Sequence, residues 1–92
     1  MLEVARRSRV EIIIDVLEAL QDEGPMTPTR LATVANMPYD RLQTVLEPLV
    51  AKGLVRVRDM GRSKQVEITR EGVRALHDLK RVRRLLSDLG FA

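Results

Sequence analysis

The chain has 92 residues, of which 45% are hydrophobic and 32% are charged, and this size and balance fit one packed domain rather than a disordered tail. It contains no cysteine, which excludes disulfide frameworks and thiolate metal sites and leaves the cytoplasm as the expected compartment. The net charge is +3, with the positive excess in the second half of the chain, and this bias favours a polyanionic partner.

The first predicted element is an amphipathic helix from about Arg9 to Asp22. Ser8 and Glu11 have the spacing of a capping box, apolar residues then recur at helical intervals, and Gly24 ends the pattern. Acidic residues interrupt this apolar stretch, which argues against an export signal, and no stretch reaches the roughly 20 apolar residues of a membrane span. No membrane partner is therefore expected.

A short helix and a tight turn are predicted next. Thr27 before Pro28 has the pattern of an N-cap followed by proline at the first helical position, and the helix should continue through Ala35. Asn36 suits the left-handed conformation that ends a helix, and Pro38 can open another. The segment therefore predicts a helix-turn-helix.

The second helix of this pair is predicted from Tyr39 to Lys52, where Gly53 stops it. Pro48 lies inside this range and predicts either a bend or an early end near Glu47, because proline removes one helical hydrogen bond. The apolar period continues past Pro48. The expected core-facing side consists of Leu42, Val45, Leu46, Leu49 and Val50.

The period then changes from helical to alternating. Residues 55–58 and 65–68 alternate between apolar and polar side chains, which predicts two strands joined by a polar, glycine-containing turn over residues 59–64. Thr69 should cap a last helix from about Arg70 to Leu89. This order predicts a mainly α fold with a small β-hairpin, the winged helix-turn-helix.

The segments RRSRVEIIIDVLEAL, ANMPYDRLQTVLEPLVAKGLV and VEITREGVRAL follow one another along nearly the whole chain. In their order and spacing the chain resembles the archaeal winged helix-turn-helix DNA-binding family that includes the ten-kilodalton Sulfolobus-type chromatin proteins. The resemblance implies DNA binding and dimerisation through the C-terminal helix. The chain departs from the family pattern at Pro38, where a serine-like cap is usual, at Pro48, and in the shortness of its C-terminal helix.

The expected division of the chain follows from these elements. Residues 1–70 are predicted to form the winged helix-turn-helix DNA-binding domain. Residues 71–92 are predicted to form a C-terminal helix that packs partly on the core and partly serves as a dimerisation seam.

Candidate DNA contacts come from three places, and the alternative for each is an ordinary solvated surface. The outward face of the helix over residues 39–52 offers side chains that read bases or hold phosphates. The hairpin concentrates cations suited to phosphate or minor-groove contacts. Arg6, Arg7 and Arg9 precede or open the first helix, where a phosphate partner would offset the unfavourable helix dipole. The candidates are Tyr39, Arg41, Gln43, Thr44, Arg58, Arg62, Ser63, Lys64, Arg6 and Arg7.

The predicted last helix carries an apolar stripe with the period of a coiled-coil seam. Its members, spaced four and three residues apart, are Ala75, Leu79, Val82, Leu86 and Leu89. The stripe predicts a homodimer, parallel or antiparallel. The alternative is that it packs on its own domain, since it is shorter than the three or four heptads typical of a coiled coil.

No pattern of catalytic residues is present in the sequence. His77 is the single histidine, and neither a phosphate-binding glycine loop nor a nucleophile–base pair is visible, so we expect no enzyme activity, metal, cofactor or small-molecule substrate. The leading hypothesis is a homodimer that binds double-stranded DNA, as a transcription regulator or as an architectural chromatin protein at the nucleoid. The two aromatic residues, Tyr39 and Phe91, form no stacking platform for unpaired bases, which disfavours RNA.

The alternative hypothesis is a winged helix used for protein contacts, as an interaction module or a subunit of a larger transcription assembly. Such a surface should carry exposed apolar anchors. Arg62, Ser63 and Lys64 dominate the hairpin turn instead, with Met60 as its one apolar residue, and this composition favours nucleic acid.

Overall fold

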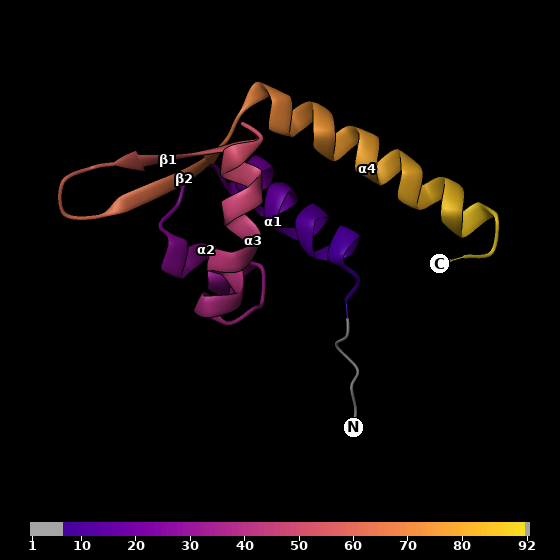
Figure 1. The fold of residues 1–92 in the computed structure, drawn as a ribbon, viewed down its shortest axis with the longest axis horizontal. Helices are drawn as coiled ribbons and strands as arrows, with labels where there is room; N and C mark the ends of the chain where they lie inside the picture. Colours follow the sequence, from indigo (N-terminus) through magenta and orange to yellow (C-terminus); the bar gives the residue numbers. More distant parts are fainter. Residues whose placement is uncertain (1–6, 92) are drawn as a thin grey trace.

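The computed structural model describes residues 7–91, and its elements follow the predicted order (Figure 1). Within this range the winged helix-turn-helix prediction is confirmed, with every predicted element boundary correct to within one residue. The elements are α1 (Arg9–Glu23), α2 (Pro28–Val34), α3 (Tyr39–Ala51), β1 (Val55–Asp59), β2 (Lys64–Ile68) and α4 (Arg70–Asp88).

Helix α1 begins with the capping box that the sequence predicts. The Ser8 hydroxyl accepts from the Glu11 N–H at 3.1 Å, and the Glu11 carboxylate accepts from the Ser8 N–H at 3.2 Å. Helix α2 begins in a similar way, because the Thr27 hydroxyl accepts from the Arg30 N–H at 3.2 Å. These bonds satisfy backbone donors that a helix N-terminus otherwise leaves without partners.

The turn between α2 and α3 has the predicted conformation. Asn36 has a φ of 58°, the left-handed region, and Pro38 is the N-cap of α3, where its side chain makes no capping hydrogen bond. Helix α3 continues through Pro48 to Ala51, so the alternative of an end near Glu47 is wrong. The apolar side chains on both sides of Pro48, Leu46 and Leu49, are buried, and this packing offsets the hydrogen bond that the proline removes.

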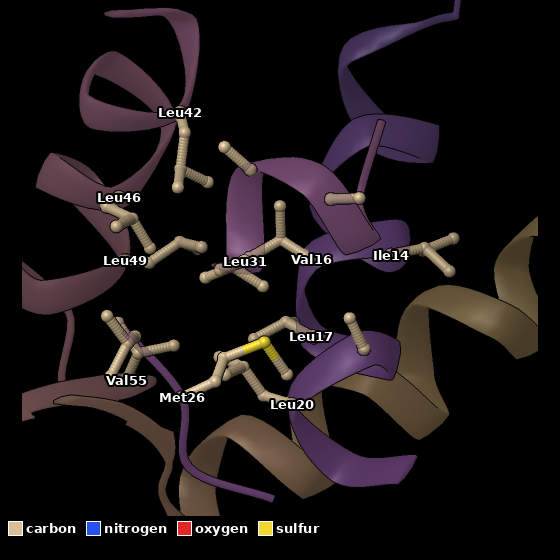
Figure 2. Close-up of a cluster of buried hydrophobic side chains, with 14 of the residues drawn as sticks. Ile14, Val16, Leu17, Leu20, Met26, Leu31, Leu42, Leu46, Leu49 and Val55 are labelled. Carbon is tan, nitrogen blue, oxygen red and sulfur yellow. The ribbon is translucent and has the colours of Figure 1, made fainter. Parts of the chain in front are cut away.

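The core lies between α1, α2, α3, the hairpin and the first half of α4 (Figure 2). It is built from aliphatic side chains and one methionine, Met26, whose backbone also pairs with Val66 of β2 through hydrogen bonds of 3.1 and 2.7 Å. This bridge extends the two-stranded sheet by one residue, a feature without a sequence signal. The labelled core residues are Ile14, Val16, Leu17, Leu20, Met26, Leu31, Leu42, Leu46, Leu49 and Val55.

Helix α4 is attached to the domain at its start. The Thr69 hydroxyl donates to the carbonyl oxygen of Gly53 at 2.6 Å and accepts from the Gly72 N–H at 3.0 Å, while the Thr69 N–H donates to the Leu54 carbonyl at 3.1 Å. Leu76 is fully buried and Lys80 pairs with Glu18 of α1 at 2.6 Å. Beyond this pair the helix projects from the domain, at the end opposite the hairpin (Figure 1).

Two apolar residues that follow the apolar period of their helices are exposed. Val10 in the first turn of α1 and Val50 in the last turn of α3 are each 42% exposed. Val50 lies about 80° around the helix from Leu42, at the edge of the apolar stripe, which explains its exposure. Within residues 7–91, no helix combines the length and apolarity that crossing a bilayer requires.

Candidate nucleic-acid interface

The outward side of α3 carries the candidate residues that the sequence places there. Tyr39, Arg41, Gln43 and Thr44 are all accessible, and the buried leucines of the helix occupy the opposite side. The Thr44 hydroxyl donates to the Asp40 carbonyl at 3.3 Å, which leaves its lone pairs open to a further donor. Tyr39 and Gln43 lie on the side of α3 toward the hairpin and Arg41 on the side toward α1, with Thr44 between them. Their role in DNA binding stays a prediction.

Between α3 and the hairpin lies an open groove of about 760 Å³. Its walls include Gln43 and Thr44 from α3 and Lys64 from β2. Val50 and Val57 form part of its apolar floor, with 42% and 40% of their surface exposed. The alternation of β1 and the helical period of α3 assign these two valines to the core, so the sequence pattern alone does not indicate that they lie on the surface.

The hairpin pairs its strands in an antiparallel register that sets Arg56 opposite Glu67. Arg56 donates from Nε to Glu67 Oε2 at 2.7 Å, and Arg58 Nη1 lies 3.5 Å from Oε1 of the same carboxylate. The hydrogen bond from Arg56, together with the charges of Arg56 and Arg58, holds the pKa of Glu67 below its ordinary value of 4.5, although partial burial opposes the shift. Glu67 therefore stays ionised and partly neutralises two of the four cations of the hairpin, which we call the wing cations: Arg56, Arg58, Arg62 and Lys64.

The turn of the hairpin is fully exposed and holds the remaining wing candidates, Arg62, Ser63 and Lys64. It is closed by a hydrogen bond of 2.8 Å from the Met60 N–H to the Ser63 carbonyl and by the Asp59 carboxylate, which accepts from the Gly61 N–H at 3.0 Å. The four wing cations thus form two groups. Arg62 and Lys64 have no carboxylate within ion-pair distance in the described part of the chain, whereas Arg56 and Arg58 share Glu67.

Arg7 is a candidate DNA contact that the structure places inside the protein's own bonding network. Its guanidinium donates to Asp15 Oδ2 at 2.7 Å and to the carbonyl oxygens of Ala35 and Asn36 at 2.9 and 2.8 Å. These bonds compete with any phosphate contact. Arg6, the candidate beside it, lies outside the described residues.

The candidate dimer stripe of α4 has a half-buried part near the domain and an exposed part farther along the helix. Ala75 and Leu79 are half-buried, and Leu79 packs against the domain core. Val82, Leu86 and Leu89 are exposed by 47%, 42% and 61%, and Leu85, which the stripe did not include, is exposed by 56%. An unpartnered apolar surface thus remains on the projecting half of α4. We call it the distal face, composed of Val82, Leu85, Leu86 and Leu89.

The described residues contain no group of three or more histidine, cysteine or carboxylate side chains placed to hold a metal ion. His77 is exposed on α4.

Residues 6–87 match the family model described as Winged helix-turn-helix. The match covers most of the chain, and the chain belongs to this family. Its fold is that of winged-helix DNA-binding transcription regulators. The predicted resemblance is confirmed at this level.

Solved structures give the same assignment. Sso10a-2, a DNA-binding protein from Sulfolobus solfataricus, is similar with a TM-score of 0.80 at 25% identity, over 90% of this chain and 85% of that one. The transcriptional regulator BldR from the same organism has a TM-score of 0.73 at 29% identity, over 86% of this chain, which spans 59% of BldR. A comparison with curated proteins found no match.

One similar structure contains DNA. A mutant of MarR from E. coli, complexed with operator DNA, has a TM-score of 0.67 at 24% identity, over 75% of this chain and 51% of that one. At this identity the likeness concerns the fold alone.

Proposed function

We propose that this chain binds double-stranded DNA as a homodimer, as a transcription regulator or an architectural chromatin protein, and that it has no catalytic activity. The observation that carries the proposal is the outward side of α3, where Arg41, Gln43 and Thr44 stand exposed while the leucines behind them are buried. A recognition helix requires this arrangement, because base edges and phosphates must be reached by side chains that the core does not use.

The relatives support the same function. Sso10a-2 is named as a DNA-binding protein and BldR as a transcriptional regulator, and both are similar to this chain over most of its length. The similarity to Sso10a-2 also favours membership of the chromatin-protein group that the sequence resembles. A role of this kind would place the protein at the nucleoid.

The hairpin is proposed to hold the DNA backbone. Arg62 and Lys64 are exposed and lack carboxylate partners among residues 7–91, so each can bind a phosphate without first breaking an ion pair. Arg58 would have to share its charge between Glu67 and a phosphate. We therefore assign the wing contact mainly to Arg62 and Lys64, with Ser63 between them as a hydroxyl donor.

Dimerisation is proposed to occur through the distal face of α4. Four adjoining aliphatic side chains with 42% to 61% exposure are costly in water, and pairing with a second copy would remove them from it. Ala75 and Leu79 extend the stripe toward the domain but are already half-buried there. The interface should therefore be centred on Val82 and Leu86.

Binding of the full chain to random and genomic duplexes across a salt series tests this function. We expect an affinity that falls linearly with the logarithm of salt concentration, because cations on the protein displace condensed counterions. The variants Arg62→Ala and Lys64→Ala should each lower the slope by about one and weaken all duplexes alike. A preference for particular genomic duplexes would assign a regulator, and equal binding to all an architectural protein. Absence of binding at about 50 mM salt would overturn the proposal in favour of a protein-interaction module.

A further inference from the structure

Two hollows flank α3, and Thr44 belongs to the lining of both. One is the groove toward the hairpin described above. The other, of about 230 Å³, lies between the first turn of α1 and the outer side of α3, and Arg9 and Arg41 line it from opposite sides. Its remaining walls are mainly aliphatic, contributed by residues such as Ile12 and Val45. Thr44 therefore stands on the ridge of α3, between the two.

The two hollows differ in charge. The groove toward the hairpin has one acid and one cation in its lining, Glu47 and Lys64, whose charges offset each other. The hollow toward α1 has two cations, Arg9 and Arg41, and no acid in its lining. Within residues 7–91, neither arginine has a carboxylate at ion-pair distance. An anion is thus favoured on the α1 side of the helix.

A helix seated in the major groove of DNA has a sugar–phosphate backbone on each side, because the groove is only about 12 Å wide. In a complex with α3 in that position, one backbone runs along the hairpin side and the other along the α1 side. The backbone on the α1 side would meet the hollow that holds both arginines. Guanidinium groups bind phosphate oxygens through two parallel hydrogen bonds, which makes arginine well suited to this contact.

We propose that the hollow between α1 and α3 is a phosphate-binding site, with a phosphodiester of the DNA backbone as its ligand and Arg9 and Arg41 as its two cations. The inference rests on the proposed function and specifies it. It assigns Arg41 to the backbone rather than to a guanine edge, and it leaves base reading to Gln43 and Thr44. It also separates the arginines at the start of the chain's first helix, since Arg7 is bonded within the protein and Arg9 is exposed at the hollow.

The test compares Arg9→Gln with wild type on the same duplexes across a salt series. Gln removes the charge and keeps much of the side-chain length, and position 9 is exposed, so the fold should persist, as circular dichroism can verify. We expect weaker binding to random and preferred duplexes alike, with a salt slope reduced by about one. Arg9→Lys, which retains the charge, should preserve the slope. Arg84→Gln, at an exposed position on α4, is the matched control for loss of one positive charge.

Three results would overturn the inference without affecting the proposed function. An equal loss in Arg9→Gln and Arg84→Gln would reduce the effect to net charge, with DNA binding itself intact. An unchanged slope in Arg9→Gln would remove the α1 side from the interface, again without affecting the proposed function. A loss in Arg41→Ala on preferred duplexes only would assign Arg41 to a base and leave the hollow without its second cation. Wild-type protein that binds no duplex would instead overturn the proposed function and this site together.

Discussion

Arg7, which precedes α1, and Asp15, in the second turn of α1, form an ion pair with 2.7 Å between Nη1 and Oδ2. The same guanidinium reaches the carbonyl oxygens of Ala35 and Asn36. One side chain therefore connects α1 to the turn that directs α3 outward. Because Asn36 holds a left-handed conformation at that turn, which residues other than glycine rarely adopt, the bonds from Arg7 help to hold this backbone in place.

Replacing Arg7 by alanine should lower the free energy of unfolding by about 1–2 kcal/mol, since charge-assisted hydrogen bonds to partly buried acceptors are lost. Urea denaturation measures this change. The salt slope of DNA binding should stay that of wild type, because the guanidinium is already engaged within the protein. A slope lowered by about one, with unchanged stability, would instead support the phosphate contact that the sequence predicts. Arg84→Ala, at an exposed position on α4, is the control for the stability effect.

Replacing Leu86 by aspartate should convert a dimer to a monomer. The charge would have to be buried between two copies of the distal face, at a cost of several kcal/mol per carboxylate. Light scattering at micromolar concentration reports the mass directly. Arg84→Asp places the same charge at an exposed position off the stripe and should remain a dimer. A monomeric wild type, or a Leu86→Asp variant that stays dimeric, would contradict the assignment.

The carboxylate of Glu67 should titrate below its ordinary pKa of 4.5, because the hydrogen bond from Arg56 and the charges of Arg56 and Arg58 stabilise the ionised form. The lowered pKa means that the ion pairs contribute stability fully above pH 4.5 and lose it as the pH falls through the folded-state value. A carboxyl NMR titration measures the midpoint, and Arg56→Ala should raise it. A midpoint equal in the two proteins would show that the pair is not formed in solution.

Gly72 allows α4 to start against the base of the hairpin. A β-carbon there would collide with the Leu54 carbonyl oxygen and lie 2.6 Å from Ile68 Cγ1. Gly72→Ala should therefore lower the free energy of unfolding by about 1–3 kcal/mol, despite the better helix propensity of alanine. Thermal or urea unfolding checks this expectation, with Arg84→Ala, at an exposed position on the same helix, as a variant of unchanged stability. A neutral or stabilising Gly72→Ala would indicate that β2 and α4 can move apart.

The elements were predictable from the sequence because their signals are local. Caps at Ser8, Thr27 and Thr69 and the change of period after Gly53 each depend on neighbouring residues only. The hydrogen bonds and ion pairs of the candidate site depend instead on residues that are far apart in the sequence. Arg7 and Arg9 are two residues apart in the sequence, and only the placement of Asp15 and the α2–α3 turn distinguishes their environments.

The ion pair between Arg56 and Glu67 is intermediate between the local signals and the long-range contacts. It follows from the hairpin register. A turn that makes Asp59 and Lys64 cross-strand partners also sets Arg56 opposite Glu67, so the position of the turn in the sequence is enough to predict this pair. The exposure of Val50 had a weaker signal, its place at the edge of the apolar stripe of α3. Sequence periodicity resolves the centre of a buried stripe better than its margins.

Thr69 bonds the beginning of α4 to the segment that leaves α3, so the two helices keep a fixed relative orientation. In a dimer joined through the distal face, α4 would therefore act as a rigid arm that sets how far apart two α3 helices are held. Half-sites on one face of DNA recur about every 34–36 Å. Inserting one residue between Lys80 and Val82 would turn the distal face by about 100°, whereas inserting seven would nearly restore its direction and lengthen the arm by about 10 Å. The preferred half-site spacing should change with the length of this arm, even though no inserted residue touches DNA.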